Sequence, residues 1–401
     1  MAFIAPAGTR LTFADLARGN VRSLSGTAIE DLESDLCRRS RRERTWLFST
    51  GRAAMVVAFQ AMRRVSGDPR RVEVIIPGYT CYSVPAAAER AGLIPRLCDV
   101  DPRTLGPDLE SLSSIDTSRV LAIVSSNLYG LPNELVEIER FARDQGIFML
   151  DDAAQALGAR LHGRPAGGFG DVGLYSFDKG KNITTVQGGA LVAGSGALAD
   201  VIDAVSAETR RAAPIEQLVC LCKLHAYAML LRPSLYGLVR RLPLGLGLTP
   251  YETDYPITLY GRGLAGHASC QLAQLDLING VRAANAGKLF DALAGSPGLS
   301  MVEALDEAEP VYARFPMLAR ADARAAMIAS LEAAGIGATT SYPCALIDVP
   351  QVAARLAPDQ QPTPGAKDVA RQVVTLPTHA YSPAELPGRI RSIVDRMIER
   401  P

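Results

Sequence analysis

The stretch GIFMLDDAAQALGA (residues 146–159) is an apolar run that ends in two carboxylates, Asp151 and Asp152. Similar apolar runs occur before and after it, at residues 72–76, 93–100, 120–126 and 173–177. Helical patterns such as 52–62 and 134–145 separate them. This alternation predicts an α/β protein with a mostly parallel central sheet covered by helices on both faces. Ligands bind beyond the carboxyl ends of such strands, so we expect the two carboxylates to lie at a ligand site.

Outside the alternating region, which extends over about 46–195, the sequence pattern changes. Residues 196–295 have an almost wholly helical pattern, and residues 296–401 combine short strand and helix patterns. At about 150 residues per domain, a chain of 401 residues suits two domains of unequal size. We therefore predict a large domain over 1–295, with a helical N-terminal segment and a helical insertion near 214–250. A small α+β domain would follow over 296–401.

The composition excludes some classes of protein. The chain has 42 basic and 42 acidic residues, so it lacks the basic field that a general nucleic-acid binder needs. Its seven cysteines are scattered and odd in number, which predicts reduced thiols and a cytoplasmic protein. The first ten residues, MAFIAPAGTR, have no basic region before their short apolar run, so we expect no signal peptide. No charge-free apolar stretch reaches the roughly 18 residues that a membrane span requires.

Two segments have compositions that leave their roles open. Residues 38–44 are rich in arginine. Two explanations are open: the arginines lie on a solvated helix face, or they contact phosphate or the surface of a membrane. Residues 218–248 are unusually apolar but are interrupted by charges, so they cannot cross a bilayer. This segment can pack against the protein or a second subunit, or it can contact an apolar ligand or the surface of a membrane.

Lysine is rare, which narrows any chemistry that needs an amine. The candidates are Lys179, Lys181, Lys223, Lys288 and Lys367. Lys181 follows Asp152 by 29 residues and Ser176 by five. Further upstream, FSTGRAAM (48–55) places Gly51 at the start of a predicted helix. The N–H groups and dipole of a helix N-terminus bind phosphate without a side chain.

Together these parts are what a pyridoxal 5′-phosphate (PLP) site requires. An amine forms a Schiff base with the cofactor aldehyde. A carboxylate keeps the ring nitrogen protonated, so that the ring can accept electrons. A helix N-terminus and a hydroxyl hold the phosphate. Each part alone is weak evidence, because a lone loop lysine is usually a solvated charge and an acid after a strand is more often structural.

The order and spacing of the motifs resemble the DegT/DnrJ/EryC1/StrS family of PLP-dependent sugar aminotransferases, which have the aspartate aminotransferase (type I) fold. The resemblance is strong over about 45–295 and looser over 296–400. It rests on the segments STGRAA (49–54), DDAAQALGA (151–159), GGFGDVGLYSF (167–177), SFDKGKNITTVQGG (176–189), HASCQLAQL (267–275) and TLPTH (375–379).

The resemblance implies a role for each matching position. Lys181 would form the Schiff base, and Asp152 would pair with the pyridinium nitrogen, so these two would be the catalytic residues. Gln155 would contact the hydroxyl side of the ring. Ser176 and the backbone at Gly51–Arg52 would hold the phosphate. Lys179 competes with Lys181, but the spacing and the following asparagine favour Lys181.

The chain also departs from the family pattern. Where the family usually stacks an aromatic ring on the cofactor, Cys81 takes the aligned position, and Tyr82 follows it, so either side chain could cover the ring. The family also has an asparagine that reaches the partner subunit's site, and here Tyr260 aligns near that position. Other motif positions differ at Asn127, Asp178 and Gln187. These changes affect the substrate side more than the cofactor side.

We therefore expect an aminotransferase that takes an amino group from an amino acid, by resemblance L-glutamate. The acceptor would be a ketone, by resemblance a nucleotide-linked ketosugar or a cyclitol. The resemblance also implies a homodimer with shared active sites. Two alternatives stay open, namely another PLP reaction such as decarboxylation or carbon–carbon bond formation, and a non-catalytic PLP-binding regulatory protein. The family's dehydratases carry histidine in place of the lysine, so Lys181 argues against that reaction.

No metal site is expected. Cys220, Cys222 and His225 have ligand-type side chains, but positions 220 and 222 of a helix point about 200° apart. The G-x-G-x-x-G match at 168–173 precedes a strand and not a helix, so it does not predict a dinucleotide site. His379 beside a proline is either structural or catalytic.

Overall fold

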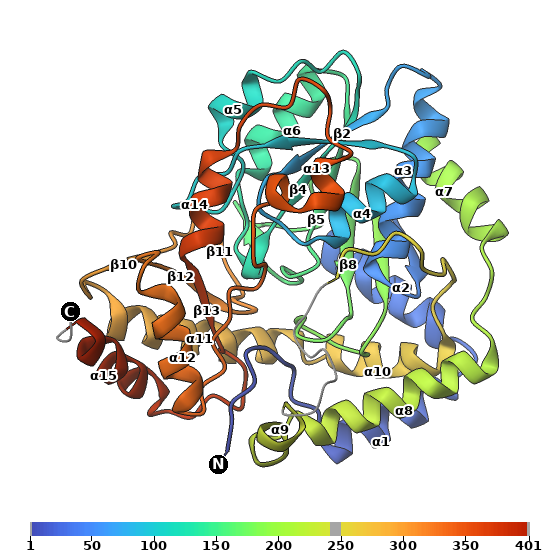
Figure 1. Ribbon diagram of the computed structural model, residues 1–401. Helices are drawn as coiled ribbons and strands as arrows, with labels where there is room; N and C mark the ends of the chain where they lie inside the picture. The colour runs from blue at the N-terminus through green and yellow to red at the C-terminus, as the bar shows by residue number, and fades with distance from the viewer. Residues whose placement is uncertain (1, 241–249, 399–401) are drawn as a thin grey trace.

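The computed structural model describes residues 2–240 and 250–398 and has a mostly parallel sheet at its centre (Figure 1). Within these residues, the strand order is β1–β9–β8–β5–β4–β2–β3. The strands are β1 (Arg44–Phe48), β2 (Glu73–Pro77), β3 (Ile94–Cys98), β4 (Val120–Ser126), β5 (Phe148–Asp152), β8 (Val172–Ser176) and β9 (Gly189–Ala193). Neighbours from β3 to β8 pair in parallel, whereas β9 is antiparallel to β8 and β1. The predicted α/β fold with a mostly parallel sheet is confirmed.

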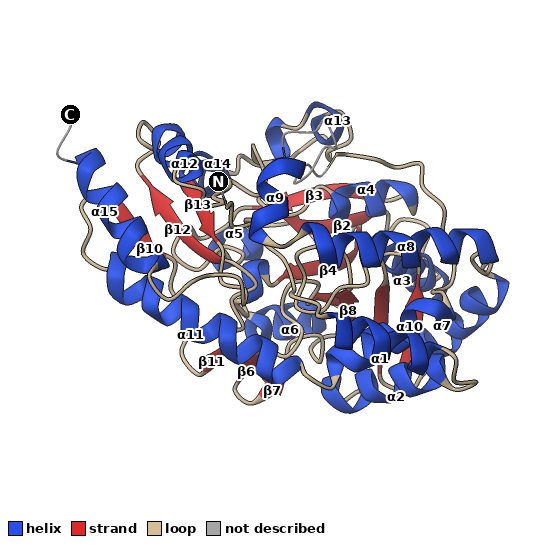
Figure 2. Cartoon of the chain, turned by 90° about the horizontal axis from the view of Figure 1, so that it is seen from below, coloured by secondary structure: helices blue, strands red, loops and turns tan. Residues whose placement is uncertain are grey.

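Helices cover both faces of this sheet (Figure 2). Alternate strand residues point to opposite faces, as in β1, where Phe48 packs in one core cluster and Leu47 in another. The first face carries α3 (Gly51–Ser66), α4 (Ser83–Arg90) and α7 (Ala197–Glu208). The second face carries α2 (Ala28–Ser40), α5 (Leu109–Ser113), α6 (Leu135–Asp144) and α10 (Arg262–Leu272). This double cover explains why the strands are almost continuously apolar.

The C-terminal part contains a separate antiparallel sheet of β10 (Leu299–Met301), β12 (Phe315–Ala319) and β13 (Val373–Leu376). Helices α12 (Arg324–Ala333) and α15 (Leu386–Ile398) share a core cluster with it. The long helix α11 (Leu275–Leu293) contributes to the same cluster and runs back toward the central sheet (Figure 1). A domain boundary at 295/296 stays a prediction.

Smaller elements complete the described chain. A short antiparallel sheet consists of β6 (Arg160–Leu161), β7 (Arg164–Pro165) and β11 (Ala308–Glu309). Two short helices, α13 (Pro350–Ala353) and α14 (Pro364–Gln372), and the 3-10 turns Leu128–Gly130 and Leu346–Asp348 also belong to the described chain.

Three further helices pack on α10 or on one another. Helix α1 (Phe13–Ser23) packs on α10. Helices α8 (Pro214–Leu230) and α9 (Pro233–Val239) fall in the expected insertion. Residues 241–249 of the apolar stretch lie outside the described residues. No helix in the described ranges is both long enough and apolar enough to cross a bilayer.

The arginine-rich run after residue 37 is not one solvated helix face, so that interpretation is wrong. Helix α2 ends at Ser40, and Arg41 has a left-handed backbone with φ of 56°. Arg42 turns inward and donates to a backbone carbonyl at 2.6 Å. Arg44 begins β1 and pairs with Asp203 at 2.5 Å. The run therefore spans a helix end, a turn and a strand, and its charges face different parts of the chain.

Candidate active site

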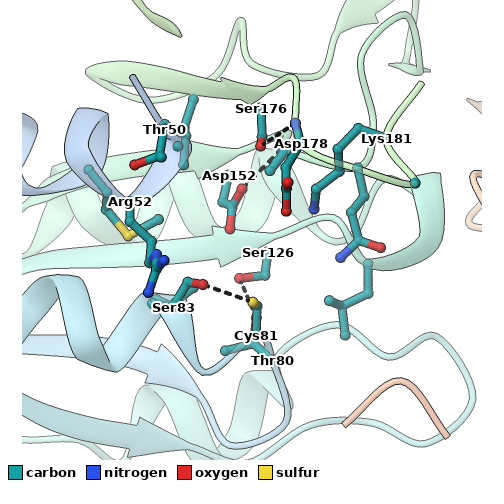
Figure 3. Close-up of a pocket in the computed structure, with 18 of the residues that line it drawn as sticks. Thr50, Arg52, Thr80, Cys81, Ser83, Ser126, Asp152, Ser176, Asp178 and Lys181 are labelled. Carbon is teal, nitrogen blue, oxygen red and sulfur yellow. Dashed lines mark hydrogen bonds between the residues drawn. The ribbon is translucent and has the colours of Figure 1, made fainter. Parts of the chain in front are cut away.

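A pocket of about 220 Å³ lies at the carboxyl edge of the central sheet. Parallel strands β4, β5 and β8 end there at Ser126, Asp152 and Ser176, and all three residues line the pocket (Figure 3). The N-terminus of α3 and the loop that carries Lys181 complete this side. The sequence therefore predicts the position of the pocket from the strand ends alone.

The structure brings most of the predicted site residues together. The pocket lining includes Gly51, Arg52, Cys81, Asp152, Gln155, Ser176 and Lys181, and also Lys179. Tyr82 lies outside the lining. Its ring packs near the ring of Tyr342, with centroids 5.8 Å apart, and its hydroxyl donates to the carbonyl of Cys344 at 3.2 Å. Cys81 is therefore the member of this pair that faces the pocket.

The two adjacent carboxylates at the end of β5 point to different surroundings, because successive strand residues alternate in direction. Asp151 is fully buried and accepts hydrogen bonds from Asn127 Nδ2 at 2.7 Å and from the N–H groups of Gly167 at 2.5 Å and Phe169 at 3.2 Å. Burial raises the pKa of Asp151 to about 6, although these three hydrogen bonds act to lower it. Its acceptor atoms are used in holding a turn, so we assign it a structural role.

Asp152 has a different environment. It is buried, and its Oδ1 accepts a hydrogen bond from the N–H of Ala154 at 3.0 Å. Burial raises the pKa of Asp152, while the Ala154 N–H and the charge of Lys181 oppose that rise. Its carboxylate projects into the pocket (Figure 3). A buried carboxylate that has acceptor capacity left suits a positively charged N–H partner.

The Lys181 amine also projects into this pocket (Figure 3). Within the described part of the chain, it forms no ion pair. Its backbone is firmly held, because its carbonyl accepts from Thr9 Oγ1 at 2.6 Å and from Arg282 at 3.2 Å. Arg282 is fully buried and also donates to the carbonyls of Gly8 at 2.9 Å and Ala313 at 3.0 Å. These hydrogen bonds connect the loop of Lys181 to the N-terminal segment and to the segment at Ala313.

The N-terminus of α3 forms the other end of the pocket. Thr50 caps the helix, because its Oγ1 accepts from the N–H of Ala53 at 3.0 Å. The guanidinium of Arg52 is engaged elsewhere, by Glu252 at 3.2 Å. What the first turn offers to a ligand is therefore its backbone N–H groups, which have no partner within the helix. Such a helix start binds an anion such as phosphate.

Close packing behind this helix start makes Gly189 critical. A Cβ on Gly189 would lie 2.5 Å from both N and Cα of Gly51. We expect Gly189→Ala to push α3 away from β9 and to lower the free energy of unfolding by about 1–3 kcal/mol. Gly194→Ala is the matched control, since a Cβ there would meet nothing within 4 Å. Thermal unfolding of both variants tests this, and equal melting temperatures would contradict it.

Three pocket residues that the sequence did not predict come from the C-terminal part of the chain. Arg314, Ser341 and Tyr342 line the same pocket. Arg314 donates to Ser341 Oγ at 3.1 Å, and Gln155 donates to the Tyr342 hydroxyl at 3.3 Å. The one available signal was Arg314 itself, which is a charge inside the apolar run 310–319.

Four further residues that the sequence singled out lie away from the pocket. His379 is buried, its Nε2 is 2.8 Å from the carbonyl oxygen of Ala5, and burial lowers its pKa to about 4, which fits the structural alternative. Cys220 is buried and Cys222 is exposed, so the two thiols do not converge. The hydroxyl of Tyr260 is 2.5 Å from that of Thr185, within the core.

The fold and the pocket together define an α/β protein of the type I PLP-dependent transferase class. The chain belongs to the DegT/DnrJ/EryC1/StrS aminotransferase family, whose sequence pattern matches residues 9–219 and 264–393.

Individual relatives agree with this assignment. A dTDP-3-amino-3,4,6-trideoxy-alpha-D-glucose transaminase of Streptomyces venezuelae is 28% identical over 375 residues, which are 93% of this chain and 87% of the relative. An L-glutamine:2-deoxy-scyllo-inosose aminotransferase of Micromonospora echinospora is 34% identical over 43% of this chain and 40% of its own length. The solved structure of S. venezuelae DesV has a TM-score of 0.75 at 25% identity, covering 97% of this chain and 95% of DesV.

Proposed function

We propose that this chain is a PLP-dependent aminotransferase that moves the amino group of L-glutamate to a ketone, and that the ketone belongs to a nucleotide-linked sugar or a cyclitol. The observation that carries this proposal is the Lys181 amine in the same pocket as the buried, incompletely hydrogen-bonded carboxylate of Asp152. The names of the relatives support the acceptor class, since they include sugar and cyclitol aminotransferases.

The residues present fit PLP. Lys181 Nζ would hold the aldehyde carbon, and Asp152 would hold the protonated ring nitrogen. The N–H groups of Gly51 and Arg52 and the hydroxyl of Ser176 would hold the phosphate, with Cys81 and Gln155 beside the ring. When bound, PLP supplies an aldehyde that condenses with amines and a ring that accepts electrons released at a substrate carbon.

The chain's own groups would then manage protons and charge. With a donor amino acid bound in place of the lysine, the free Lys181 amine would take the proton from the donor's α-carbon and would later return a proton, as a general acid–base. Asp152 would keep a proton on the ring nitrogen, because a buried carboxylate stabilises a facing cation strongly. The same two residues would serve in the second half of the reaction, in which the ketone acceptor receives the amino group.

Other features of the pocket bear on the substrates. Lys179 and Arg314 both line it, and within the described residues neither forms an ion pair with a carboxylate. Two such cations suit the carboxylates of an amino donor. A homodimer with shared sites, as the family resemblance implies, also forms part of the proposal.

The glutamate half-reaction tests the function directly. We expect L-glutamate alone to convert the PLP-loaded protein to its pyridoxamine phosphate form, with one equivalent of 2-oxoglutarate released per site. Absorbance spectra and an assay for 2-oxoglutarate measure both events. Release of carbon dioxide would instead indicate decarboxylation. An unchanged spectrum with every amino donor tried would indicate a regulatory PLP-binding protein.

A dehydratase is the second candidate, because the relatives include dehydratases. A dTDP-4-dehydro-2,6-dideoxy-D-glucose 3-dehydratase of Saccharopolyspora spinosa is 26% identical over 79% of this chain and 68% of the relative. The presence of Lys181, where the family's dehydratases carry histidine, favours amino transfer. A dehydratase would release a ketosugar that has lost a hydroxyl group and carries no new amino group, whereas amino transfer yields an aminosugar or an aminocyclitol.

A further inference from the structure

The loop that carries Lys181 has little regular structure of its own. Residues 179–184, KGKNIT, form turns and bends without a helix or a strand. The N–H of Lys181 donates to the carbonyl of Asp178 over 3.3 Å, which is longer than a typical backbone hydrogen bond. The position of the Lys181 backbone is therefore set by the segments that pack against the loop.

Thr9 is the residue through which one of these segments acts. It is buried, and its Oγ1 donates to the carbonyl of Lys181 at 2.6 Å and accepts from Arg282 at 2.9 Å. The same Oγ1 lies 3.3 Å from the carbonyl oxygen of Asn182. The threonine hydroxyl can fix the backbone of the lysine only as firmly as Thr9 itself is held.

Tyr227 of α8 holds the backbone of Thr9. Its hydroxyl oxygen accepts a hydrogen bond from the N–H of Thr9 at 3.1 Å. Burial raises the pKa of Tyr227 to about 12, although the N–H groups of Thr9 and Gly180 act to lower it. The hydroxyl thus lies close to both the N-terminal segment and the glycine that precedes Lys181. A chain of hydrogen bonds leads from α8 through Thr9 to the lysine.

The packing of the N-terminal segment leaves this chain of contacts little room to shift. A Cβ on Gly8 would lie 2.6 Å from a methyl carbon of Leu231, directly after α8. A Cβ on Gly180 would lie 3.0 Å from the Cβ of Ala7. Residues 7–9 therefore lie in close contact with both the end of α8 and the Lys181 loop.

The sequence pattern of the family does not account for this contact. It matches residues up to 219 and resumes at 264, so Tyr227 lies in the unmatched stretch. Neither Tyr227 nor Thr9 is among the residues that line the catalytic pocket. The helical insertion therefore reaches the Lys181 loop from outside the pocket, without contact to the cofactor site or the substrate site.

We propose that Tyr227 is a positioning residue, which acts through Thr9 to hold the backbone of Lys181 where its amine meets the reacting atoms. The effect on turnover rests on the proposed function, whereas the effect on the loop does not. In amino transfer the lysine side chain would leave the cofactor and return, so its backbone has to stay fixed while its side chain moves. A misplacement of about 1 Å in such a group can cost roughly a hundredfold in rate.

Hydrogen exchange on the full chain, loaded with PLP, tests the contact itself. Tyr227→Phe removes only the hydroxyl, so we expect the amides of residues 179–184 to exchange at least about threefold faster. The amides of β4, in the core of the sheet, should be unchanged. Tyr236→Phe is the matched control, because Tyr236 lies on the adjacent helix α9 and its hydroxyl forms no hydrogen bond within the described residues. Equal exchange of the loop in both variants would overturn the inference.

Two readouts separate positioning from a purely structural role. We expect Tyr227→Phe to lower turnover per bound PLP about tenfold, with KM for L-glutamate within about twofold of the native value. The visible circular dichroism of bound PLP should also weaken, because this achiral ring acquires a signal only from fixed, asymmetric surroundings. Faster exchange with native turnover and native dichroism would overturn the inference, since the hydroxyl would then serve only stability.

Thr9 allows a test with a conservative variant. Thr9→Val keeps the size of the side chain but removes Oγ1, so it should lower turnover and dichroism as Tyr227→Phe does. Thr9→Ser retains the hydroxyl and should keep both near their native values. If Thr9→Val and Thr9→Ser behaved alike, the inference would be overturned. A native chain that transfers no amino group from any donor would refute the proposed function, while exchange and dichroism would still decide this inference.

Discussion

Lys181→Ala is expected to eliminate both amino transfer and the covalent adduct that borohydride reduction traps. The substitution removes the amine that we propose bonds to the cofactor and moves the substrate proton. General acid–base catalysis alone contributes roughly 10²- to 10⁴-fold, and the covalent step is lost as well. The side chain lies in the pocket, while Thr9 and Arg282 hold the lysine through its backbone carbonyl. Alanine should therefore leave the fold intact.

Lys179→Ala is the matched control, because this lysine lines the same pocket two residues earlier. It should retain the reducible adduct, although a role in donor binding would raise KM. Adduct formation is measured by mass spectrometry after reduction, and the fold is checked by thermal unfolding. If Lys181→Ala retained the adduct and Lys179→Ala lost it, then Lys179 and not Lys181 would be the residue that bonds to the cofactor.

The second large effect is expected for Asp152→Asn. Asparagine keeps the size of the side chain and an oxygen that can accept from Ala154, but it removes the negative charge that would face the ring nitrogen. Breaking a buried ion pair costs about 3–5 kcal/mol, which corresponds to roughly 10²- to 10⁴-fold in turnover. Cofactor binding should persist, since Lys181 and the α3 N-terminus remain. Turnover per bound PLP is the measurement that checks this.

Asp151→Asn gives the contrast that separates the two neighbouring acids. Asp151 accepts three hydrogen bonds from Asn127, Gly167 and Phe169, so its loss should lower the melting temperature. Asp152→Asn should leave the melting temperature nearly unchanged. Wild-type turnover in Asp152→Asn, or a loss of turnover only in Asp151→Asn, would remove Asp152 from its proposed role.

The sequence predicts the centre of the fold well, for a physical reason. Strands β2, β3, β4, β5 and β8 are covered on both faces, so each is a nearly continuous apolar run. The edge strand β1 is harder to find, because RTWLF begins with an arginine and a threonine at the solvated end of the strand. The antiparallel direction of β9 depends on its loop back from β8, which no local pattern records.

The residues of the candidate site also fall into those that the sequence predicts and those that it does not. Its central members, Asp152, Ser176 and Lys181, sit at or near strand ends, where topology alone places them in one pocket. Successive residues at the start of a helix point in different directions around the helix axis. The sequence does not show where α4 starts, so it could not decide whether Cys81 or Tyr82 faces the pocket.

The arginines of the site depend on long-range packing. Arg282 and Arg314 reach the site because α11 and β12 fold back against the large sheet and its loops. Contacts over such separations in sequence have no signature in a local window.

The most direct test of the account is the position of the covalent link. The PLP-loaded protein is reduced with borohydride and digested, and the labelled peptide is identified by mass spectrometry. We predict a single pyridoxyl group on the Lys181 side chain. A label on any other lysine, or the absence of a label from a protein that retains PLP, would contradict the account.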